Sequence, residues 1–178
     1  MIFTPTALGG VWQIDVELHS DMRGAFARTF CAETFAAHDL PSCFVQCNLS
    51  FNSRRGTLRG LHWQADPHPE GKLIRCTGGA IFDVAVDLRP GSPTLHRWIA
   101  AELTAQNRRA LYIPPGCAHG FQTLTDDTEI FYQMTEAYHA DLARGAPWDD
   151  PTFGIVWPLP DPILSARDLT HPPVPAPL

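Results

Sequence analysis

The chain has 178 residues, of which 44% are hydrophobic and 18% charged, as expected of one globular domain with a sizeable core. Its formal net charge is −6 and the sequence has no basic stripe, so nucleic acid is excluded as a partner. No apolar run reaches the length of a membrane span, and we expect no contact with a membrane.

The cysteines and the first residues bear on the cellular compartment. There are five cysteines, an odd number without a C-x-x-C pair, which predicts reduced thiols rather than disulfides or a zinc site. The first ten residues, MIFTPTALGG, lack the basic and apolar regions of a signal peptide. We therefore expect a cytoplasmic protein.

Short alternating segments, separated by turns rich in glycine and proline, predict strands along most of the chain. In chain order, the expected strands cover residues 11–18, 25–30, 44–51, 57–64, 72–76, 80–88, 97–103, 110–113, 118–124 and 129–136. Short helices are expected over residues 32–40 and from Ser165 onward, where the serine can cap a first turn. The segments 72–76 and 80–88 flank Thr77-Gly78-Gly79 and are expected to pair as a hairpin.

Many short strands and few helices predict an all-β fold, a sandwich or barrel of the jelly-roll type with a few short peripheral helices. The segment from Gly145 onward is rich in proline but carries Trp148 and Trp157, so we expect it to pack back over the barrel. With no internal repeat and no boundary in composition, residues 1–178 are expected to form a single domain.

The segment TLRGLHWQ, residues 57–64, is the centre of the chain. Strand alternation predicts that His62, Gly60 and Gln64 share one face, with Arg59 and Trp63 on the other. A glycine inside a strand often marks the close approach of a ligand to the backbone. An isolated histidine in a strand is more often a structural group, so His62 needs support from the rest of the chain.

Residues 113–121 contain the pattern P-x-G-x-x-H, which resembles the second sequence motif of the cupin superfamily. The first cupin motif supplies H-x-H, but here the counterpart is His62-Trp63-Gln64. Because an amide oxygen replaces imidazole poorly on a transition metal, we expect neither a metal nor another cofactor. The remaining histidines show no clustering at metal-ligand spacing along the sequence.

Without a metal, the polar residues favour acid–base chemistry. His62 can act as a general base near neutral pH, and Lys72 and Arg59 can stabilise an oxyanion. Tyr132 can donate a proton, and Asp168 can orient His62 as a carboxylate orients a catalytic histidine. Tyr132 as a wall residue and Asp168 as a helix-end charge are the alternatives that spacing leaves open.

The chain resembles the dTDP-4-dehydrorhamnose 3,5-epimerase family along nearly its whole length. The matching segments, in order, are DMRGAF, VQCNLS, LRGLHWQ, GKLIRC, IFDVAVDLRPGSPT, YIPPGCAHGF, FYQMTEAY, PWDDP and LSARD. The resemblance implies a cupin-like jelly roll without a metal. It also implies a homodimer that exchanges N-terminal segments, and a nucleotide-linked 4-keto-6-deoxy sugar as substrate.

The resemblance also implies roles for individual residues. His62 matches the general base, Asp168 its carboxylate partner, Tyr132 the acid, and Lys72 the residue near the C4 oxygen of the sugar. The positions that match substrate-binding residues are Arg59 and His119 near phosphates and sugar, Gln46 and Asn48 near the nucleotide, Tyr138 in the cleft, and Arg23 and Phe26, which reach across from the partner subunit.

Three positions depart from the family pattern. Arg28 stands where an acidic residue usually lies close to the nucleotide base, Glu70 replaces a common glutamine, and His139 precedes alanine where a proline is common. A guanidinium has only hydrogen-bond donors, so Arg28 favours a base edge with acceptors, or a phosphate, over thymine. In the alternative, Arg28 turns to solvent or pairs with a carboxylate.

Four functions therefore remain after the sequence analysis. The first is a 3,5-epimerase of dTDP-4-dehydro-6-deoxy-D-glucose, acting by proton abstraction beside the C4 ketone and reprotonation from the opposite face. The second is a 3-only or 5-only epimerase, or one acting on another sugar nucleotide. A non-catalytic sugar-nucleotide-binding protein is disfavoured by the presence of an acid–base set, and a metal-dependent cupin oxygenase is disfavoured by Gln64.

Overall fold

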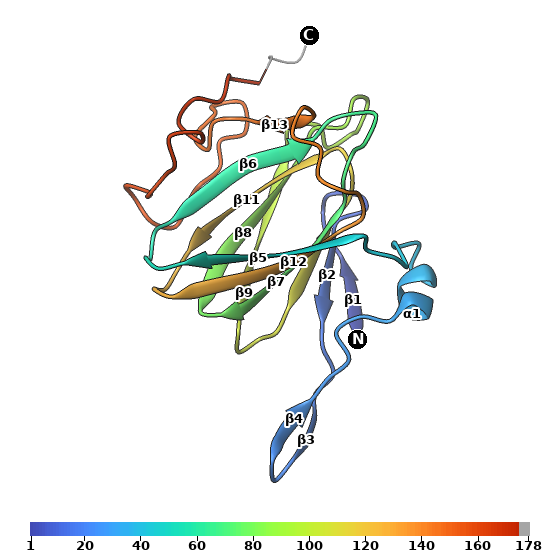
Figure 1. The fold of residues 1–178 in the computed structure, drawn as a ribbon. Coiled ribbons are helices and arrows are strands. Elements are labelled where there is room, and N and C mark those ends of the chain that lie inside the picture. Colours follow the sequence, from blue (N-terminus) through green and yellow to red (C-terminus); the bar gives the residue numbers. More distant parts are fainter. Residues whose placement is uncertain (175–178) are drawn as a thin grey trace.

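A computed structural model of the chain describes residues 1–174, and two antiparallel sheets dominate it (Figure 1). The six-stranded sheet has the order β1 (Ile2–Pro5), β2 (Trp12–Asp15), β10 (Ala110–Ile113), β7 (Lys72–Gly78), β12 (Thr128–Met134) and β5 (Gln46–Asn52). The five-stranded sheet has the order β13 (Ala143–Gly145), β6 (Leu58–Gln64), β11 (Cys117–Thr123), β8 (Ala80–Asp87) and β9 (Trp98–Thr104). The predicted all-β jelly roll is confirmed.

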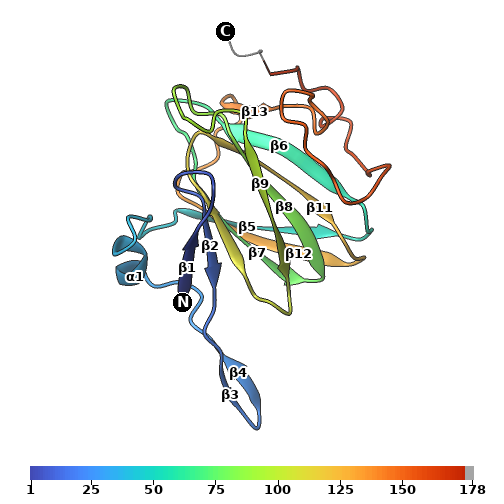
Figure 2. The ribbon, with the colours of Figure 1, turned by 180° about the vertical axis from the view of Figure 1, so that it is seen from behind.

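Two smaller elements lie outside the barrel. The strands β3 (His19–Asp21) and β4 (Gly24–Phe26) form a hairpin that projects away from both sheets (Figures 1 and 2). The helix α1 (Ala32–Ala36) buries Phe35 in a cluster on the outer side of the six-stranded sheet, beside Ile14 and Leu73. At five residues it is far too short to cross a membrane, and the described residues contain no helix that is long and apolar enough to do so.

The main hydrophobic core lies between the two sheets, and the alternation of strand residues explains its composition. In β8, Ile81 and Ala85 face this core, whereas Val84 and Val86 face the opposite side of the sheet. That opposite side is covered by the C-terminal segment, which contributes Phe153. Because both faces of β8 are covered by protein, the strand is a nearly continuous apolar run rather than a half-polar one.

The C-terminal segment runs along the outer face of the five-stranded sheet as far as the described residues extend (Figure 2). Trp157 packs in this cluster, and its indole N–H donates to the carbonyl of Trp148 at 2.8 Å. The backbone at Ile163 pairs with Thr57, just before β6. This path brings residues 165–171 to the strand that carries His62, while residues 175–178 lie outside the described part.

The hairpin predicted for residues 72–76 and 80–88 is wrong. β7 pairs with β10 and β12, whereas β8 pairs with β11 and β9 in the other sheet. The chain crosses between sheets at Gly79, whose φ is +75° and where a Cβ would lie 2.5 Å from Thr125 Oγ1. A glycine turn between two alternating segments is compatible with a hairpin and with a barrel corner, so the sequence pattern does not separate them.

The second predicted helix is also wrong, and α1 is the one helix among the described residues. Residues 166–169 form a hydrogen-bonded turn instead, in which the Leu169 N–H donates to the Ser165 carbonyl at 3.3 Å. Two prolines follow at 172 and 173 and prevent the turn from continuing as a helix. Ser165 still caps this turn, because its Oγ accepts a bond from the Asp168 N–H at 3.2 Å.

A buried carboxylate, Asp87, organises the loop after β8. It accepts bonds from Arg89 Nε at 2.8 Å, Ser92 Oγ at 2.6 Å and Thr94 Oγ1 at 2.7 Å, and its side chain is fully buried. Burial opposes ionisation, but the bonds from Arg89, Ser92 and Thr94 outweigh it and hold the pKa of Asp87 well below its usual range.

We expect Asp87→Asn to lower the free energy of unfolding by about 2–3 kcal/mol at pH 7, because it leaves Arg89 without its charged partner. A depressed native pKa stabilises the fold above the unfolded-state value of about 3.9, and this contribution is lost as the pH falls below it. The difference in free energy of unfolding between wild type and Asp87→Asn should therefore be smaller at pH 3 than at pH 5. Urea unfolding at both pH values measures this difference, and Asp141→Asn, at an exposed position, is the control. A difference of the same size at both pH values would contradict the argument.

Candidate active site

A cleft of about 280 Å³ opens between the two sheets at one end of the barrel. The six-stranded sheet contributes side chains from β5, β7 and β12, and the five-stranded sheet from β6, β11 and β13. Eight of the residues singled out in the sequence line it: Gln46, Asn48, Arg59, His62, Lys72, His119, Tyr132 and Tyr138. Residues far apart in the sequence thus meet in one cavity.

The central strand β6 departs from the strict alternation predicted for it. Arg59 and His62 both line the cleft, although alternation places them on opposite faces. The register between β6 and β11 shifts between His119 and Phe121, and Gly60 has a φ of +130°. A Cβ on Gly60 would lie 2.5 Å from the Cα of Gly120. Gly60 therefore permits the close approach of a neighbouring strand, and not of a ligand as the sequence suggested.

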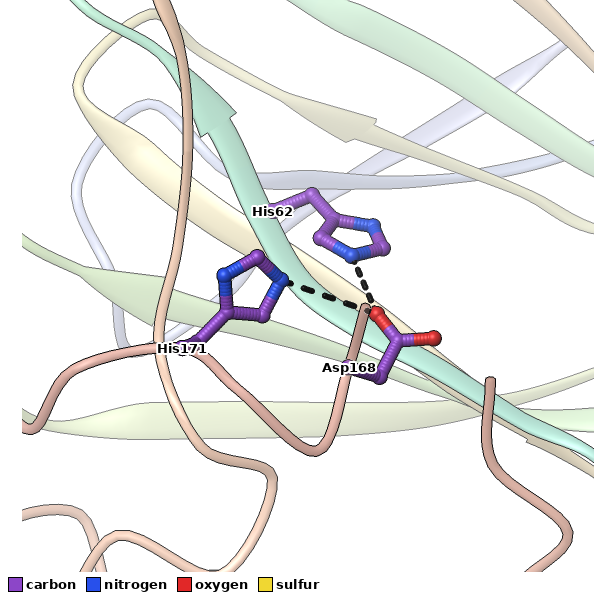
Figure 3. Close-up of side chains that lie close together, drawn as sticks. All are labelled: His62, Asp168 and His171. Carbon is purple, nitrogen blue, oxygen red and sulfur yellow. Dashed lines mark hydrogen bonds and ion pairs between the residues drawn. The ribbon is translucent and has the colours of Figure 1, made fainter. Parts of the chain in front are cut away.

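His62 and Asp168 form a short, directed pair at the cleft. The distance from His62 Nε2 to Asp168 Oδ1 is 2.6 Å (Figure 3). The His62 side chain is 38% exposed and that of Asp168 only 5%. Burial raises the pKa of Asp168, but hydrogen bonds with His62 and Ser165 outweigh burial, so the pKa lies below its ordinary value. With Nε2–H donating to this carboxylate, Nδ1 is the ring nitrogen left to accept a proton.

His171 is a further member of this cluster that the sequence analysis did not single out. Its Nε2 lies 3.7 Å from Asp168 Oδ1, and its ring meets that of His62 edge-on at 5.5 Å between centroids (Figure 3). The ring fills the space beside Gly145 that a larger residue would need. Burial lowers the pKa of His171 and the charge of His62 lowers it further, so His171 is neutral at neutral pH.

Lys72 and Tyr132 face the cleft from the six-stranded sheet. Lys72 Nζ lies 2.7 Å from Glu70 Oε1, and both side chains are 9% exposed. Burial raises the pKa of Tyr132, although the charge of Arg59 opposes the rise, and the hydroxyl therefore keeps its proton in the neutral range. A positive charge and a proton donor are thus held on the wall opposite to His62.

A second imidazole–carboxylate pair lies beside the first. His119 is the direct cross-strand partner of His62, and its Nε2 lies 2.7 Å from Asp83 Oδ1. Asp83 is fully buried, and this burial raises its pKa while His119 opposes the rise. The sequence analysis did not single out Asp83, although a carboxylate inside the apolar run IFDVAV was a usable signal.

The cleft has two further cations that sequence reasoning missed. Arg144 of β13 and Arg167 of the C-terminal segment both line it. They join Arg59 and Lys72, so four positively charged side chains converge in a chain whose formal net charge is −6. Such a local concentration of positive charge in a cleft attracts a small anion.

Three predicted binding residues do not reach the cleft of their own chain. Arg23 and Phe26 lie on the β3–β4 hairpin, which points away from the barrel (Figure 1). Phe26 is 70% exposed, and Arg23 pairs with Asp21 at 2.6 Å. Arg28 is also exposed and borders a separate small cavity with Glu17.

The amide of Gln64 makes hydrogen bonds that hold two loops together. Its Nε2 donates to the carbonyls of His68 at 2.6 Å and Ala137 at 3.0 Å, and its Oε1 accepts from the His139 N–H at 2.8 Å. Gln64 is only 3% exposed. Gln64 stands where the cupin motif has its second histidine. Here both the nitrogen and the oxygen of its amide are hydrogen-bonded to backbone groups.

A jelly-roll barrel with a histidine–aspartate pair and converging cations in a cleft between its sheets is suited to acid–base chemistry on a small anionic substrate. A family model described as dTDP-4-dehydrorhamnose 3,5-epimerase matches residues 5–175. The chain belongs to the dTDP-4-dehydrorhamnose 3,5-epimerase family, which confirms the resemblance seen in the sequence, and it is an isomerase of the carbohydrate-epimerase type.

Individual relatives agree with the family model. An enzyme named dTDP-4-dehydrorhamnose 3,5-epimerase from Sinorhizobium fredii is 44% identical over 173 residues, which cover 97% of this chain and 89% of the relative. A solved structure of the epimerase from Bacillus anthracis, with TDP and PPi bound, has a TM-score of 0.94 at 38% identity and covers 97% of this chain and 99% of that one.

A third relative shows that the same fold also serves a narrower reaction. The structure of ChmJ, a 3′-monoepimerase from Streptomyces bikiniensis in complex with dTDP-quinovose, has a TM-score of 0.87 at 34% identity. It covers 95% of this chain and 86% of that one. The fold alone therefore does not decide how many carbons are inverted.

Proposed function

We propose that the protein epimerises a nucleotide-linked 4-keto-6-deoxy sugar, with dTDP-4-dehydro-6-deoxy-D-glucose as substrate and C3 and C5 as the inverted carbons. The observation that carries this proposal is that His62 on one sheet, paired with Asp168 of the C-terminal segment, lies in the same cleft as Tyr132 on the other sheet. A base and an acid on facing sheets lie on opposite faces of a sugar ring held between them. That arrangement suits inversion at a carbon beside a ketone.

The chemistry follows from the charges of these groups. His62 Nδ1 removes the proton beside the C4 ketone, and Asp168 stabilises the imidazolium that forms. The electron pair moves to the C4 oxygen, where Lys72 stabilises the enolate by its positive charge. Tyr132, whose raised pKa keeps it protonated, returns a proton to the other face. Proton exchange with solvent then removes the proton from His62 and restores the one on Tyr132, and repetition at the second carbon inverts both centres.

The diphosphate and the nucleoside occupy the remainder of the cleft in this proposal. Arg59, Arg144 and Arg167 supply the positive charge that a diphosphate requires. Gln46 and Asn48 lie side by side on β5, where the amide of Gln46 donates to Asn48 Oδ1 at 3.2 Å. His119 lies beside His62 at the sugar, with Asp83 behind it.

The test of this function is product analysis. Purified protein is incubated with dTDP-4-dehydro-6-deoxy-D-glucose, and the configuration at C3 and C5 is read by NMR. Inversion at both carbons supports the proposal. Inversion at one carbon alone makes the protein a monoepimerase, as ChmJ is named, and an unchanged sugar that still binds makes it a sugar-nucleotide-binding protein. Parallel incubation with the UDP analogue decides whether Arg28 selects another nucleotide.

We further propose that the protein works as a homodimer in the cytoplasm. β5 is an edge strand of the six-stranded sheet, and its outer face exposes Leu49 (58%) and Phe51 (55%). The projecting hairpin exposes Met22 (100%) and Phe26 (70%). Exposed apolar side chains along an open strand edge are typical of an interface between chains. The five free cysteines are consistent with a reducing compartment.

In such a dimer the hairpin of one chain reaches the cleft of the other. Leu49→Glu introduces a charge at the centre of the interface but leaves the barrel core intact, because Leu49 is exposed in the single chain. We expect a mass of one chain instead of two by light scattering, and a fall in turnover. Gln106→Glu, at an exposed position on the loop after β9, is the matched control. A wild-type protein with the mass of one chain and full activity would contradict the dimer.

The exchange of hairpins has its own readout. When Arg23→Ala and His62→Ala chains are mixed and allowed to exchange, each mixed dimer holds one cleft with an intact His62 and an intact Arg23 from the partner. Activity should therefore recover in the mixture. A mixture as inactive as its components would rule out the exchange.

A further inference from the structure

A cluster of metal-binding side chains lies at the rim of the cleft, outside the proposed catalytic groups. His68, Glu136 and His139 each place one ligand atom within 4.8 Å of the others. His68 Nδ1 lies 3.6 Å from Glu136 Oε2, and the two imidazole rings are stacked at 4.2 Å between centroids. Spacing along the sequence did not reveal this cluster, because the fold joins two loops that are distant in the sequence.

The backbone on both sides of this cluster is held by one buried amide. Gln64 bonds the carbonyl of His68, the carbonyl of Ala137 and the N–H of His139. His68 belongs to the loop between β6 and β7, and the other two ligands follow β12. The buried amide therefore holds the two loops at a constant separation without an ion, which reduces the entropy lost when an ion binds.

We propose that His68, Glu136 and His139 form a binding site for a divalent transition metal of the zinc class. Two imidazole nitrogens and one carboxylate oxygen are a ligand set that Zn²⁺ accepts, with water completing a tetrahedron. In the present arrangement the rings of His68 and His139 lie 10° from parallel, so each must turn about its Cβ–Cγ bond to direct a nitrogen at a common point. The His68 side chain is 44% exposed and His139 is only partly buried, so both rings have room to turn.

The charge at the site also suits a cation. Glu136 Oε1 accepts a hydrogen bond from the Ala137 N–H at 2.9 Å, and Oε2 lies 3.6 Å from His68 Nδ1, so the site presents a carboxylate oxygen to the two imidazoles. The two loops joined by the ion also carry Glu70 and Tyr138, which line the cleft. An ion at this site therefore ties the rim loops of the cleft together.

The test is titration of the metal-free full-length protein with ZnCl₂ by calorimetry, in a buffer that does not chelate. We expect one site per chain in the wild type. Glu136→Gln should weaken the affinity at least about tenfold, because it removes the only charged ligand, and His139→Ala should abolish this binding event. Bound zinc should raise the Tm of the wild type by roughly 5–10 °C at a hundredfold excess over Kd, and leave that of His139→Ala unchanged.

A second cluster, His62, Asp168 and His171, also holds its ligand atoms within 4.8 Å of one another and could bind the same ion. A control variant must therefore distinguish the two clusters. His171→Ala removes a ligand there and leaves the rim cluster intact, so it should bind zinc as the wild type does. Circular dichroism without metal verifies that each variant is folded. Absence of binding to the wild type, binding that survives His139→Ala, or binding that disappears in His171→Ala would each overturn the assignment to the rim.

Discussion

Replacement of His62 by alanine is expected to lower turnover by about 10²–10⁴-fold, the usual contribution of a positioned general base. The proposed base nitrogen is Nδ1, because Nε2 is directed at Asp168 at 2.6 Å. The fold should survive, since the His62 side chain is 38% exposed in a cleft rather than packed in the core. Turnover under saturating substrate measures the effect, with His38→Ala as control, because His38 stacks on Phe3 next to α1 and does not line the cleft.

The loss should lie in kcat more than in KM, because a base acts in the transition state while the diphosphate is bound by the arginines. The circular dichroism spectrum and Tm of His62→Ala should match those of the wild type. A folded His62→Ala protein with undiminished kcat would remove His62 from the role of base.

The second large effect is expected from Asp168→Asn, which should lower kcat by roughly 10²-fold or more through the wrong imidazole tautomer. Ser165 Oγ already accepts a hydrogen bond from the Asp168 backbone N–H. The Ser165 hydroxyl therefore donates its own proton to Asp168 Oδ2, 2.7 Å away. An asparagine amide will therefore turn its oxygen to Ser165 and its NH₂ to His62. His62 Nε2 must then accept, the proton moves to Nδ1, and the base is lost.

This argument predicts a rescue that a merely structural role of Asp168 does not. Ser165→Ala removes the group that fixes the amide, so the double variant with Asp168→Asn should regain part of the activity lost in the single variant. Steady-state kinetics of the wild type, both single variants and the double variant complete a double-mutant cycle. Strictly additive losses, or a fully active Asp168→Asn enzyme, would show that Asp168 does not control the tautomer of His62.

Local pattern was sufficient to predict most strands. β10 occurs at the predicted residues 110–113, and β6 covers 58–64 where 57–64 was predicted, because alternating apolar residues between glycine and proline turns have few other solutions. The pattern failed where local signals are weak: β1 is a short edge strand ending in proline, and β13 has three residues of sequence ARG. Both are strands through pairing with a neighbour, which a local pattern does not contain.

The residues of the candidate site were also predicted only in part, because some of them come together only in the folded chain. The cleft residues of β5, β6, β7, β11 and β12 were found because conspicuous motifs carry them, and the structure brings them together. Arg144, Arg167 and His171 were missed because they lie in the C-terminal part of the chain, whose path over the sheet no periodicity predicts. The rim cluster of His68, Glu136 and His139 was missed because its members lie on two loops that are distant in the sequence and meet only in the fold.

The most direct test of the account is the transfer of solvent deuterium to the sugar. Wild-type protein and His62→Ala are incubated with dTDP-4-dehydro-6-deoxy-D-glucose in heavy water, and deuterium at C3 and C5 is located by NMR. The account predicts deuterium at both carbons, each with inverted configuration, for the wild type, and incorporation slowed by about 10²–10⁴-fold in His62→Ala. Rapid incorporation by His62→Ala, or inversion by the wild type without deuterium at the inverted carbon, would contradict proton abstraction by His62.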